Sequence, residues 1–494
     1  MNGKGLLLGL SCLGLLICGT SYAADSSFRF VGATTVSVSD CASVTGNSSG
    51  WCRRNWPPNG RGTVYQYSFQ ETRLATGAVL VRTAYVYKPD QIRAGTSYPL
   101  LTWLHGGTQS ADQMFENFAF AELADGRSDA SKITWRQNTA SCQQGPHGSS
   151  LYKLGGTSVG GFVSTGGNGS SCTPPNQKYA RPSSAPAFFL VLPNGIEDAA
   201  GNGRSWEDGR NPSPGQYSTP NPDQQKRDDV GFIDTLIATI KQQQGTLVDA
   251  TRVYIGGVSN GGLMTTRLLC NVNAYPELAR VAAYSVSVGS MADNLYTGAN
   301  GREQCTSAGT QLAALSIFVG YSSPTPNAGN SNFVANCNPY NPSDPAYPSL
   351  PACPYPTTSG DSVMPYGPAL DVGGGTYTVN SPTTGKVIAS FDNERFWLNY
   401  LSASGAGAAN VSSGSLGYFS LVRRYSFARS PLLMQVIETV DGLHYNNSAR
   451  ADFEATARIY DFLFSFRKSN GLLQYVGGSI DAASGRFGNL SGVY

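Results

Sequence analysis

Short apolar runs alternate with amphipathic segments through the middle and the end of the chain. The apolar runs predict buried β-strands at residues 84–87, 100–104, 188–192, 253–255, 315–319 and 432–437. Apolar residues recur at helical spacing in residues 230–243, 262–269 and 451–466. Short, continuously apolar strands of this kind are buried on both faces of a parallel sheet. The alternation therefore predicts an α/β fold, in which helices cover both faces of a mostly parallel central sheet.

Two long stretches interrupt this pattern. Residues from about 129 to 185 are rich in Gly, Ser, Thr and Asn, and residues from about 321 to 360 are rich in Pro, Asn, Ser and Tyr. Neither stretch has enough apolar periodicity to bury a core of its own. We interpret both as loop insertions in one domain, residues 24–494, where they either shape a substrate cleft or decorate the surface.

The N-terminal residues 1–23 have the features of an export signal. Lys4 supplies the positive charge, residues 6–17 form a short apolar run, and small residues precede the expected cleavage after Ala23. The apolar run is shorter than the roughly 20 residues needed to cross a bilayer, so no membrane anchor is expected. Lipid attachment at Cys18 is disfavoured, because Ile17 stands where a small residue is required. We therefore expect a secreted protein, extracellular or periplasmic.

The cysteine content suits an oxidising compartment. Beyond the export signal an even number of cysteines remains: Cys41, Cys52, Cys142, Cys172, Cys270, Cys305, Cys337 and Cys353. In an exported chain such a set indicates disulfides, and the spacing favours pairing in chain order, although sequence alone leaves the connectivity open. None of these cysteines has paired Cys-x-x-Cys spacing, which disfavours a structural zinc site.

The balance of charges excludes some partners. The chain has 34 basic and 32 acidic residues, a formal net charge of +2. This gives no electrostatic reason to expect nucleic acid or an anionic membrane as a partner.

A Gly-x-Ser-x-Gly motif joins the strand at residues 253–255 to the helix at residues 262–269. A serine on a sharp turn from strand to helix has strained dihedral angles, and its hydroxyl is exposed above the sheet. Side chains at Gly257 and Gly261 would clash where the chain doubles back. The motif alone is weak, but these flanking elements make Ser259 the candidate nucleophile.

A second glycine-containing loop follows the strand at residues 100–104. Acyl transfer needs two backbone N–H donors for the developing oxyanion, one from the residue after the nucleophile and one from such a loop. We expect the donors to be the amides of Asn260 and Gly107, with Thr108 as the alternative to Gly107. His105 is interpreted as a structural residue at the strand end.

The order of residues along the chain then limits the choice of base and acid. The chain has 3 histidines, of which His444 follows Ser259, as the order Ser, acid, His requires. The acid must lie between them to orient the imidazole. Asp361 is preferred for its turn context, and Asp371 and Asp392 are rivals.

Several segments together resemble one family. Residues 104–110, 205–210 (Ser-Trp-Glu-Asp-Gly-Arg), 228–233 (Asp-Asp-Val-Gly-Phe-Ile) and 254–264 are similar, in order, to the polyhydroxybutyrate depolymerase and feruloyl-esterase-like family of secreted α/β-hydrolases. The segment that begins at Asp361 is similar to the acid loop of this family. The resemblance covers roughly residues 85–466 without the two insertions. Two features depart from the family: Gly107 replaces the usual Cys, and the long insertion separates Asp361 from the preceding strand.

The resemblance implies an α/β-hydrolase fold and a serine esterase that needs no metal and no cofactor. Hydroxyalkanoate polyester or its oligomers are the expected substrates, and feruloyl or acetyl esters of plant polysaccharide are the alternative. An inactive hydrolase fold that serves as a binding protein is less favoured, because all three triad residues are present. Trp206 is a candidate for the wall of the substrate cleft, or else a core residue. The sequence gives no indication of oligomeric state.

Overall fold

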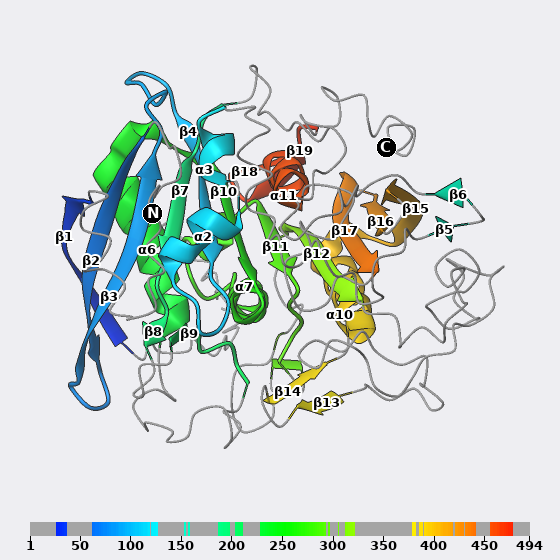
Figure 1. Ribbon diagram of the computed structural model, residues 1–494, viewed down its shortest axis with the longest axis horizontal. Helices are drawn as coiled ribbons and strands as arrows, with labels where there is room; N and C mark the ends of the chain where they lie inside the picture. Colours follow the sequence, from blue (N-terminus) through cyan, green and yellow to red (C-terminus); the bar gives the residue numbers. More distant parts are fainter. Residues whose placement is uncertain are drawn as a thin grey trace, which may run out of the picture.

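The computed structural model of the protein describes residues 26–36, 62–118, 120–126, 153–154, 157–158, 186–197, 203–210, 228–292, 295–296, 305, 312–321, 378–381, 385–388, 390–417, 420–428, 430–440 and 455–477. Its centre is an 11-stranded twisted sheet (Figure 1). In spatial order the strands are β1 (Ser26–Thr35), β2 (Thr63–Arg73), β3 (Val79–Lys88), β7 (Phe189–Pro193), β4 (Tyr98–Leu104), β10 (Val248–Val258), β11 (Ala283–Ser287), β12 (Ala314–Tyr321), β17 (Ser430–Val440), β16 (Ser420–Phe427) and β15 (Ala409–Gly417).

The middle of this sheet is parallel and its two flanks are antiparallel. Strands β7, β4, β10, β11, β12 and β17 pair in parallel, whereas β1, β2 and β3 on one side and β16 and β15 on the other pair antiparallel with their neighbours. If β1, β16 and β15 are left aside and the remaining strands are numbered by their position in the chain, their spatial order across the sheet is 1-2-4-3-5-6-7-8. Only the second of these strands, β3, runs antiparallel to the others. This is the α/β-hydrolase fold, as the sequence predicted.

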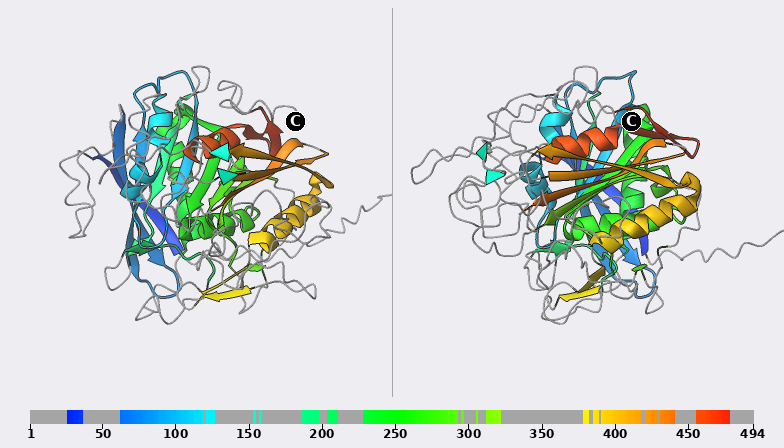
Figure 2. Two further views of the ribbon diagram at one scale, coloured as in Figure 1. Left: turned by 45° about the vertical axis from the view of Figure 1, so that its right-hand side comes forward. Right: turned by 90° about the vertical axis from the view of Figure 1, so that its right-hand side faces the viewer.

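Helices cover both faces of the sheet (Figure 2). Helices α2 (Ala111–Asn117), α3 (Phe120–Ala124) and α11 (Ala455–Phe464) lie on one face, and α6 (Asp229–Gln244), α7 (Asn260–Cys270) and α10 (Ser390–Leu401) lie on the other. Every residue of β4 is buried, which is why this strand has a continuous apolar run rather than an alternating one. The described helices include none that is long and apolar enough to span a bilayer.

The six predicted strands all overlap observed strands of the sheet, and the helices predicted at residues 230–243 and 262–269 lie within α6 and α7. Of the helix predicted at residues 451–466, the structure describes α11, which ends at Phe464, earlier than predicted. Phe466 instead begins β18 (Phe466–Ser469), which pairs with β19 (Leu472–Tyr475). The sequence did not predict β1, β2, β11, β15, β16 or α10.

Three further two-stranded ladders lie outside the central sheet. They are formed by β5 (Lys153–Leu154) with β6 (Thr157–Ser158), β8 (Ile196–Glu197) with β9 (Arg204–Ser205), and β13 (Thr378–Ser381) with β14 (Gly385–Ile388). The rest of both proposed insertions, the proposed export signal and most of the proposed disulfides lie outside the described residues. The disulfide between Cys270 and Cys305 is present, and it ties the end of α7 to a residue 35 positions later.

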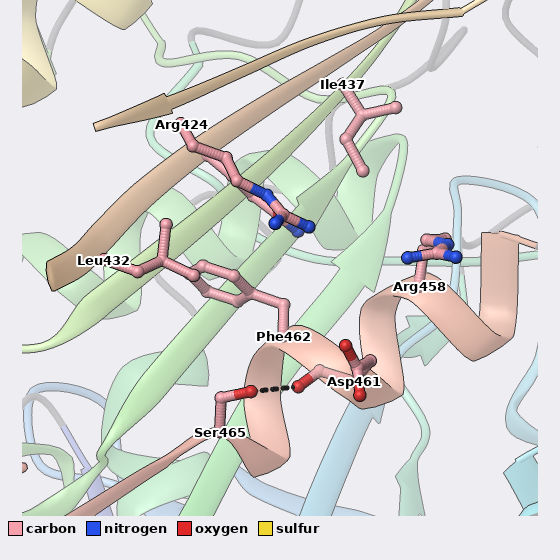
Figure 3. Close-up of a pocket in the computed structure, with 8 residues that line it drawn as sticks. Arg424, Leu432, Ile437, Arg458, Asp461, Phe462 and Ser465 are labelled. Carbon is pink, nitrogen blue, oxygen red and sulfur yellow. Dashed lines mark hydrogen bonds between the residues drawn. The ribbon is translucent and has the colours of Figure 1, made fainter. Parts of the chain in front are cut away.

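Helix α11 meets the sheet through charged as well as apolar side chains (Figure 3). A small cavity between this helix, β16 and β17 is lined by Arg424, Arg458 and Asp461 together with apolar and uncharged polar residues. The three charged residues are buried. At the end of the helix, the Ser465 hydroxyl donates to the backbone carbonyl of Asp461 at 2.5 Å. The apolar stripe of α11 is therefore interrupted where it faces the outer strands.

Candidate active site

Ser259 lies at the junction of β10 and α7. Its φ of 56° and ψ of −118° form a strained combination for a residue with a side chain. A Cβ atom at Gly257 would lie 2.4 Å from the carbonyl oxygen of Gly261, and a Cβ atom at Gly261 would lie 2.4 Å from the carbonyl oxygen of Leu104. The predicted steric need for both glycines is therefore confirmed. The turn leaves the Ser259 side chain partly exposed at the carboxyl end of the parallel strands.

Strained backbone is concentrated at this edge of the sheet. Thr108 (φ 61°), Ser259 (φ 56°) and Val288 (φ 42°) follow β4, β10 and β11, which are adjacent strands. Hydrogen bonds hold two of these turns: the Ser259 amide donates to the carbonyl of Ser287 at 2.9 Å, and the Val288 amide donates to the carbonyl of Phe318 at 2.8 Å. A strained backbone conformation persists only where the surrounding structure holds it in place, and such residues cluster at functional sites. This edge is therefore the strongest candidate for the site of chemistry in the described part of the chain.

The loop after β4 lies directly against the serine turn. A Cβ atom at Gly106 would lie 3.4 Å from the Cβ of Ser259, and a Cβ atom at Gly107 would lie 3.5 Å from the Cβ of Asn260. Asn260 is the first residue of α7, so its amide has no carbonyl partner within the helix, and the helix N-terminus favours negative charge nearby.

The amides of this loop differ in availability. The Thr108 amide donates to the carbonyl of Arg204 at 2.8 Å, so it is already occupied. Within the described part of the chain, the Gly107 amide donates no hydrogen bond. The geometry thus favours Gly107 over Thr108 as the partner of Asn260 in binding an oxyanion.

His105 is held as a neutral, buried residue. Its Nδ1 lies 2.7 Å from the carbonyl oxygen of Gly106 and donates to it, while Nε2 accepts from the amide of Gly195 at 2.9 Å. One donating and one accepting nitrogen define the neutral imidazole. Burial lowers the pKa of His105 to about 4. The side chain therefore fixes the loop and is not available as a base, as its position at the strand end suggested.

Trp206 lies in the core and packs against His105 of the same loop. The indole is 4 % exposed, its ring centroid is 4.9 Å from that of His105, and its Nε1 donates to the backbone carbonyl of His105 at 2.9 Å. Of the two roles considered for Trp206, the structure favours the core residue over the cleft wall.

The segment around Trp206 also holds the start of the nucleophile helix. The side-chain oxygen of Asn260 accepts from the Trp206 amide at 2.7 Å, and its nitrogen donates to the Trp206 carbonyl at 3.1 Å and to Asp208 at 2.5 Å. Asp208 in turn forms an ion pair with Arg210 at 2.7 Å. The sequence pattern indicated no role for the Asn260 side chain, and it singled out Asp208 only as part of a segment that resembles the family.

A buried ion network anchors this segment to α6. Asp229, the first residue of α6, accepts from the Glu207 amide at 2.6 Å and forms an ion pair with Arg82 at 2.5 Å. Arg82 also pairs with Glu71 at 2.9 Å, and neither Arg82 nor its two partners are more than 1 % exposed. Asp228 caps the helix by accepting from the Gly231 amide at 2.7 Å. Two adjacent aspartates at the start of an amphipathic helix are a sequence signal from which the cap could have been predicted. The pairing of Asp229 with the distant Arg82 has no such signal in the sequence.

The proposed base and acid are not among the described residues. His444, Asp361 and Asp371 all lie outside them, and Asp392 lies within α10. Strand β17, which ends at Val440, runs parallel to β12, so it ends at the same edge of the sheet as β10. Among the described residues, no group of three or more His, Cys, Asp and Glu side chains is arranged to hold a metal ion.

Comparisons with known proteins add little to this geometry. No protein-family model matches the chain, and no curated protein sequence matches it. Among solved structures, a mutant of the feruloyl esterase module from Clostridium thermocellum complexed with sinapinate is similar at 11 % identity, over 55 % of this chain and 72 % of that one, with a TM-score of 0.26.

Two other solved structures are similar to the same extent. A ferulic acid esterase matches at 13 % identity over 53 % of this chain and 81 % of its own, with a TM-score of 0.26. An S-formylglutathione hydrolase from Agrobacterium tumefaciens matches at 12 % identity over 60 % of this chain and 80 % of its own, with a TM-score of 0.29. At such scores the assignment of the fold rests on strand order and not on these matches, which do not include a polyhydroxybutyrate depolymerase by name.

Proposed function

We propose that this protein is a secreted serine esterase that hydrolyses carboxylic esters, with Ser259 as the nucleophile. The observation that carries the proposal is the strained turn at Ser259, which holds a partly exposed serine beside the Gly106–Gly107 loop and the amino end of α7. In this fold such a turn presents a nucleophile to a substrate above the sheet.

The reaction proceeds through an acyl-enzyme. His444 removes the proton from the Ser259 hydroxyl, whose oxygen attacks the ester carbonyl carbon. The amides of Gly107 and Asn260 stabilise the oxyanion, and the alcohol leaves with the proton from His444. Water, activated by the same histidine, then releases the acid and restores the serine. Asp361 keeps His444 in the correct tautomer and stabilises its charged form.

Chain order and strand direction support the choice of His444. It follows Val440, the last residue of β17, by four positions, and β17 ends at the edge of the sheet where Ser259 lies. Asp361 rests on the sequence alone. Hydroxyalkanoate polyesters or their oligomers are the proposed substrates because of the motif resemblance, and aromatic or acetyl esters of plant polysaccharide are the alternative.

Two features support an exported protein with a single catalytic domain. The disulfide between Cys270 and Cys305 is of the kind that persists outside the reducing cytosol. The apolar core is continuous from β2 to β18 across the described strands and helices. The export signal at residues 1–23 would be removed, which leaves one domain from residue 24 to residue 494.

Hydrolysis by the purified mature chain tests the proposal. The substrates are p-nitrophenyl butyrate, methyl ferulate, a hydroxybutyrate oligomer and an emulsified polyester, each also offered to Ser259→Ala. Activity that disappears in Ser259→Ala supports the esterase, and the best substrate decides between polyester and plant-wall ester. Folded wild-type protein that cleaves none of the four would refute it and favour a binding protein. His444→Ala and Asp361→Asn test the other two roles, with Asp371→Asn as the control for the acid.

A further inference from the structure

We propose that Asp208 positions the oxyanion-binding amide of Asn260 by holding the Asn260 side chain. This inference rests on the proposed esterase function and assigns a role to a residue that does not touch the substrate. An ion pair links Arg210 to Asp208, and a hydrogen bond links Asp208 to Asn260, the first residue of α7.

The hydrogen bonds of Asn260 leave its side chain a single orientation. The amide oxygen accepts from the Trp206 amide, and the amide nitrogen donates both to the Trp206 carbonyl and to Asp208. The two bonds to Trp206 form a closed ring with the backbone, and the third bond requires an acceptor on the far side of the nitrogen. Asp208 is that acceptor. Because the side chain is fixed at its end, the Cα and the amide of Asn260 are fixed as well.

Asp208 is itself held from the opposite side. Its Oδ1 accepts from the backbone amide of Arg210 at 3.1 Å and from the Arg210 Nε at 3.0 Å, and its Oδ2 lies 2.7 Å from a terminal guanidinium nitrogen. Both carboxylate oxygens therefore face donors. Asp208 is 3 % exposed and Asn260 is 4 % exposed, so water is a poor substitute for either partner.

The oxyanion site needs this rigidity. The neighbouring donor, Gly107, approaches Asn260 closely, with 3.5 Å between the Asn260 Cβ and the position of a Cβ on Gly107. A shift of Asn260 therefore changes the spacing of both donors. Catalytic groups must be held to within about 0.5 Å, and loss of one whole oxyanion donor costs about 100-fold to 1,000-fold in kcat. Misplacement of a donor that is still present should cost less, about 10-fold to 100-fold.

Asp208→Asn is a sharp test because the two side chains have the same shape. In either orientation of the new amide, its nitrogen would face a donor, from Arg210 or from Asn260. We expect kcat to fall about 10-fold to 100-fold while KM changes less than about twofold, since the misplaced amide acts on the transition state. The affinity for a boronic acid that forms a tetrahedral adduct with Ser259 should fall by the same factor as kcat/KM.

A matched variant separates this role from a general loss of stability. Glu277 is also a buried carboxylate in an ion pair, 2.5 Å from Lys241, but it lies outside the proposed site. Glu277→Gln should leave kcat and boronic acid affinity unchanged. If Asp208→Asn loses no more activity than Glu277→Gln, the inference is wrong.

A double-mutant cycle covers the case in which Asp208→Asn folds poorly. Asn260→Ala retains the backbone amide and removes the side chain through which Asp208 is proposed to act. The double variant should then be no less active than Asn260→Ala alone. Activity is measured per folded enzyme, counted by the burst that Ser259 produces. If the loss in the double variant equals the product of the losses in Asp208→Asn and Asn260→Ala, the inference is wrong, while an active wild type still supports the esterase function. An inactive wild type overturns both.

Discussion

The strained turn at Ser259 should cost stability, and replacing the serine with glycine should recover part of that cost. Its φ of 56° and ψ of −118° are readily accepted by glycine but are unfavourable for a residue with a Cβ, by about 1 to 3 kcal/mol. Ser259→Ala loses the hydroxyl and keeps the strain, whereas Ser259→Gly loses both. Glycine costs about 0.5 to 1 kcal/mol in chain entropy relative to alanine, so Ser259→Gly should be the more stable variant by about 1 kcal/mol.

Reversible urea unfolding of the two variants measures this difference directly. Both variants lack the hydroxyl, so their difference isolates the cost of a Cβ at this turn. Both should be inactive toward esters. At an unstrained position the order reverses, because glycine is then less stable than alanine by about 0.5 to 1 kcal/mol. A Ser259→Ala variant that is the more stable of the two would therefore refute the reasoning, because the strain at this turn would then be smaller than the entropic cost of glycine.

Three further predictions concern packing, the disulfide and pH. Gly261→Ala should lose activity and at least about 1 to 3 kcal/mol of unfolding free energy, because its Cβ would lie 2.4 Å from the carbonyl oxygen of Leu104. Replacing Cys270 and Cys305 together with serine should lower the unfolding free energy by about 4 kcal/mol, since the bridge spans 35 positions. His105 has a pKa of about 4 when folded against 6.5 for the free side chain, so the unfolded chain binds its proton first. The unfolding free energy should fall by up to about 1.4 kcal/mol per pH unit from this group as the pH drops from about 6.5 to about 4, and His105→Asn should reduce that slope.

Each of these has its own control. Gly32→Ala has no atom within 4 Å of the added Cβ and should leave activity and stability nearly unchanged; equal losses in both glycine variants would contradict the packing argument. For the bridge, wild-type protein under reducing conditions should match the double serine variant. For His105, an identical pH slope in wild type and variant would show that the imidazole titrates normally in the folded protein.

The apolar pattern of the sequence determined the centre of the fold. The strand at residues 253–255 could be recognised because both faces of β10 are buried there, which leaves an unbroken apolar run. The helix at residues 262–269 is buried over nearly its whole length in α7, and its apolar residues still recur at helical spacing. The Gly-x-Ser-x-Gly motif located the strained serine for the same local reason: the residues that make the turn are contiguous.

The sequence did not predict the outer strands because they depend on contacts with residues far away in the chain. Strand β15 has the sequence Ala-Asn-Val-Ser-Ser-Gly-Ser-Leu-Gly, whose pattern does not indicate a strand, and it is held by pairing with β16. Strand β16 contains two buried arginines, one of which pairs with Glu394 of α10 at 2.6 Å. A charge that is neutralised from a distant helix looks solvent-exposed in the sequence.

The same distinction separates the nucleophile from its supports. The sequence by itself determined the fold class and the serine turn, because both depend on neighbouring residues and on periodicity. Only the tertiary structure decided that Asp208 holds Asn260, which lies 52 positions away, and that Arg82 lies between Glu71 and Asp229, 147 positions from the latter. Such pairs form only when the fold brings distant strands and helix termini together. A buried polar group is stable only when its partner is in contact with it.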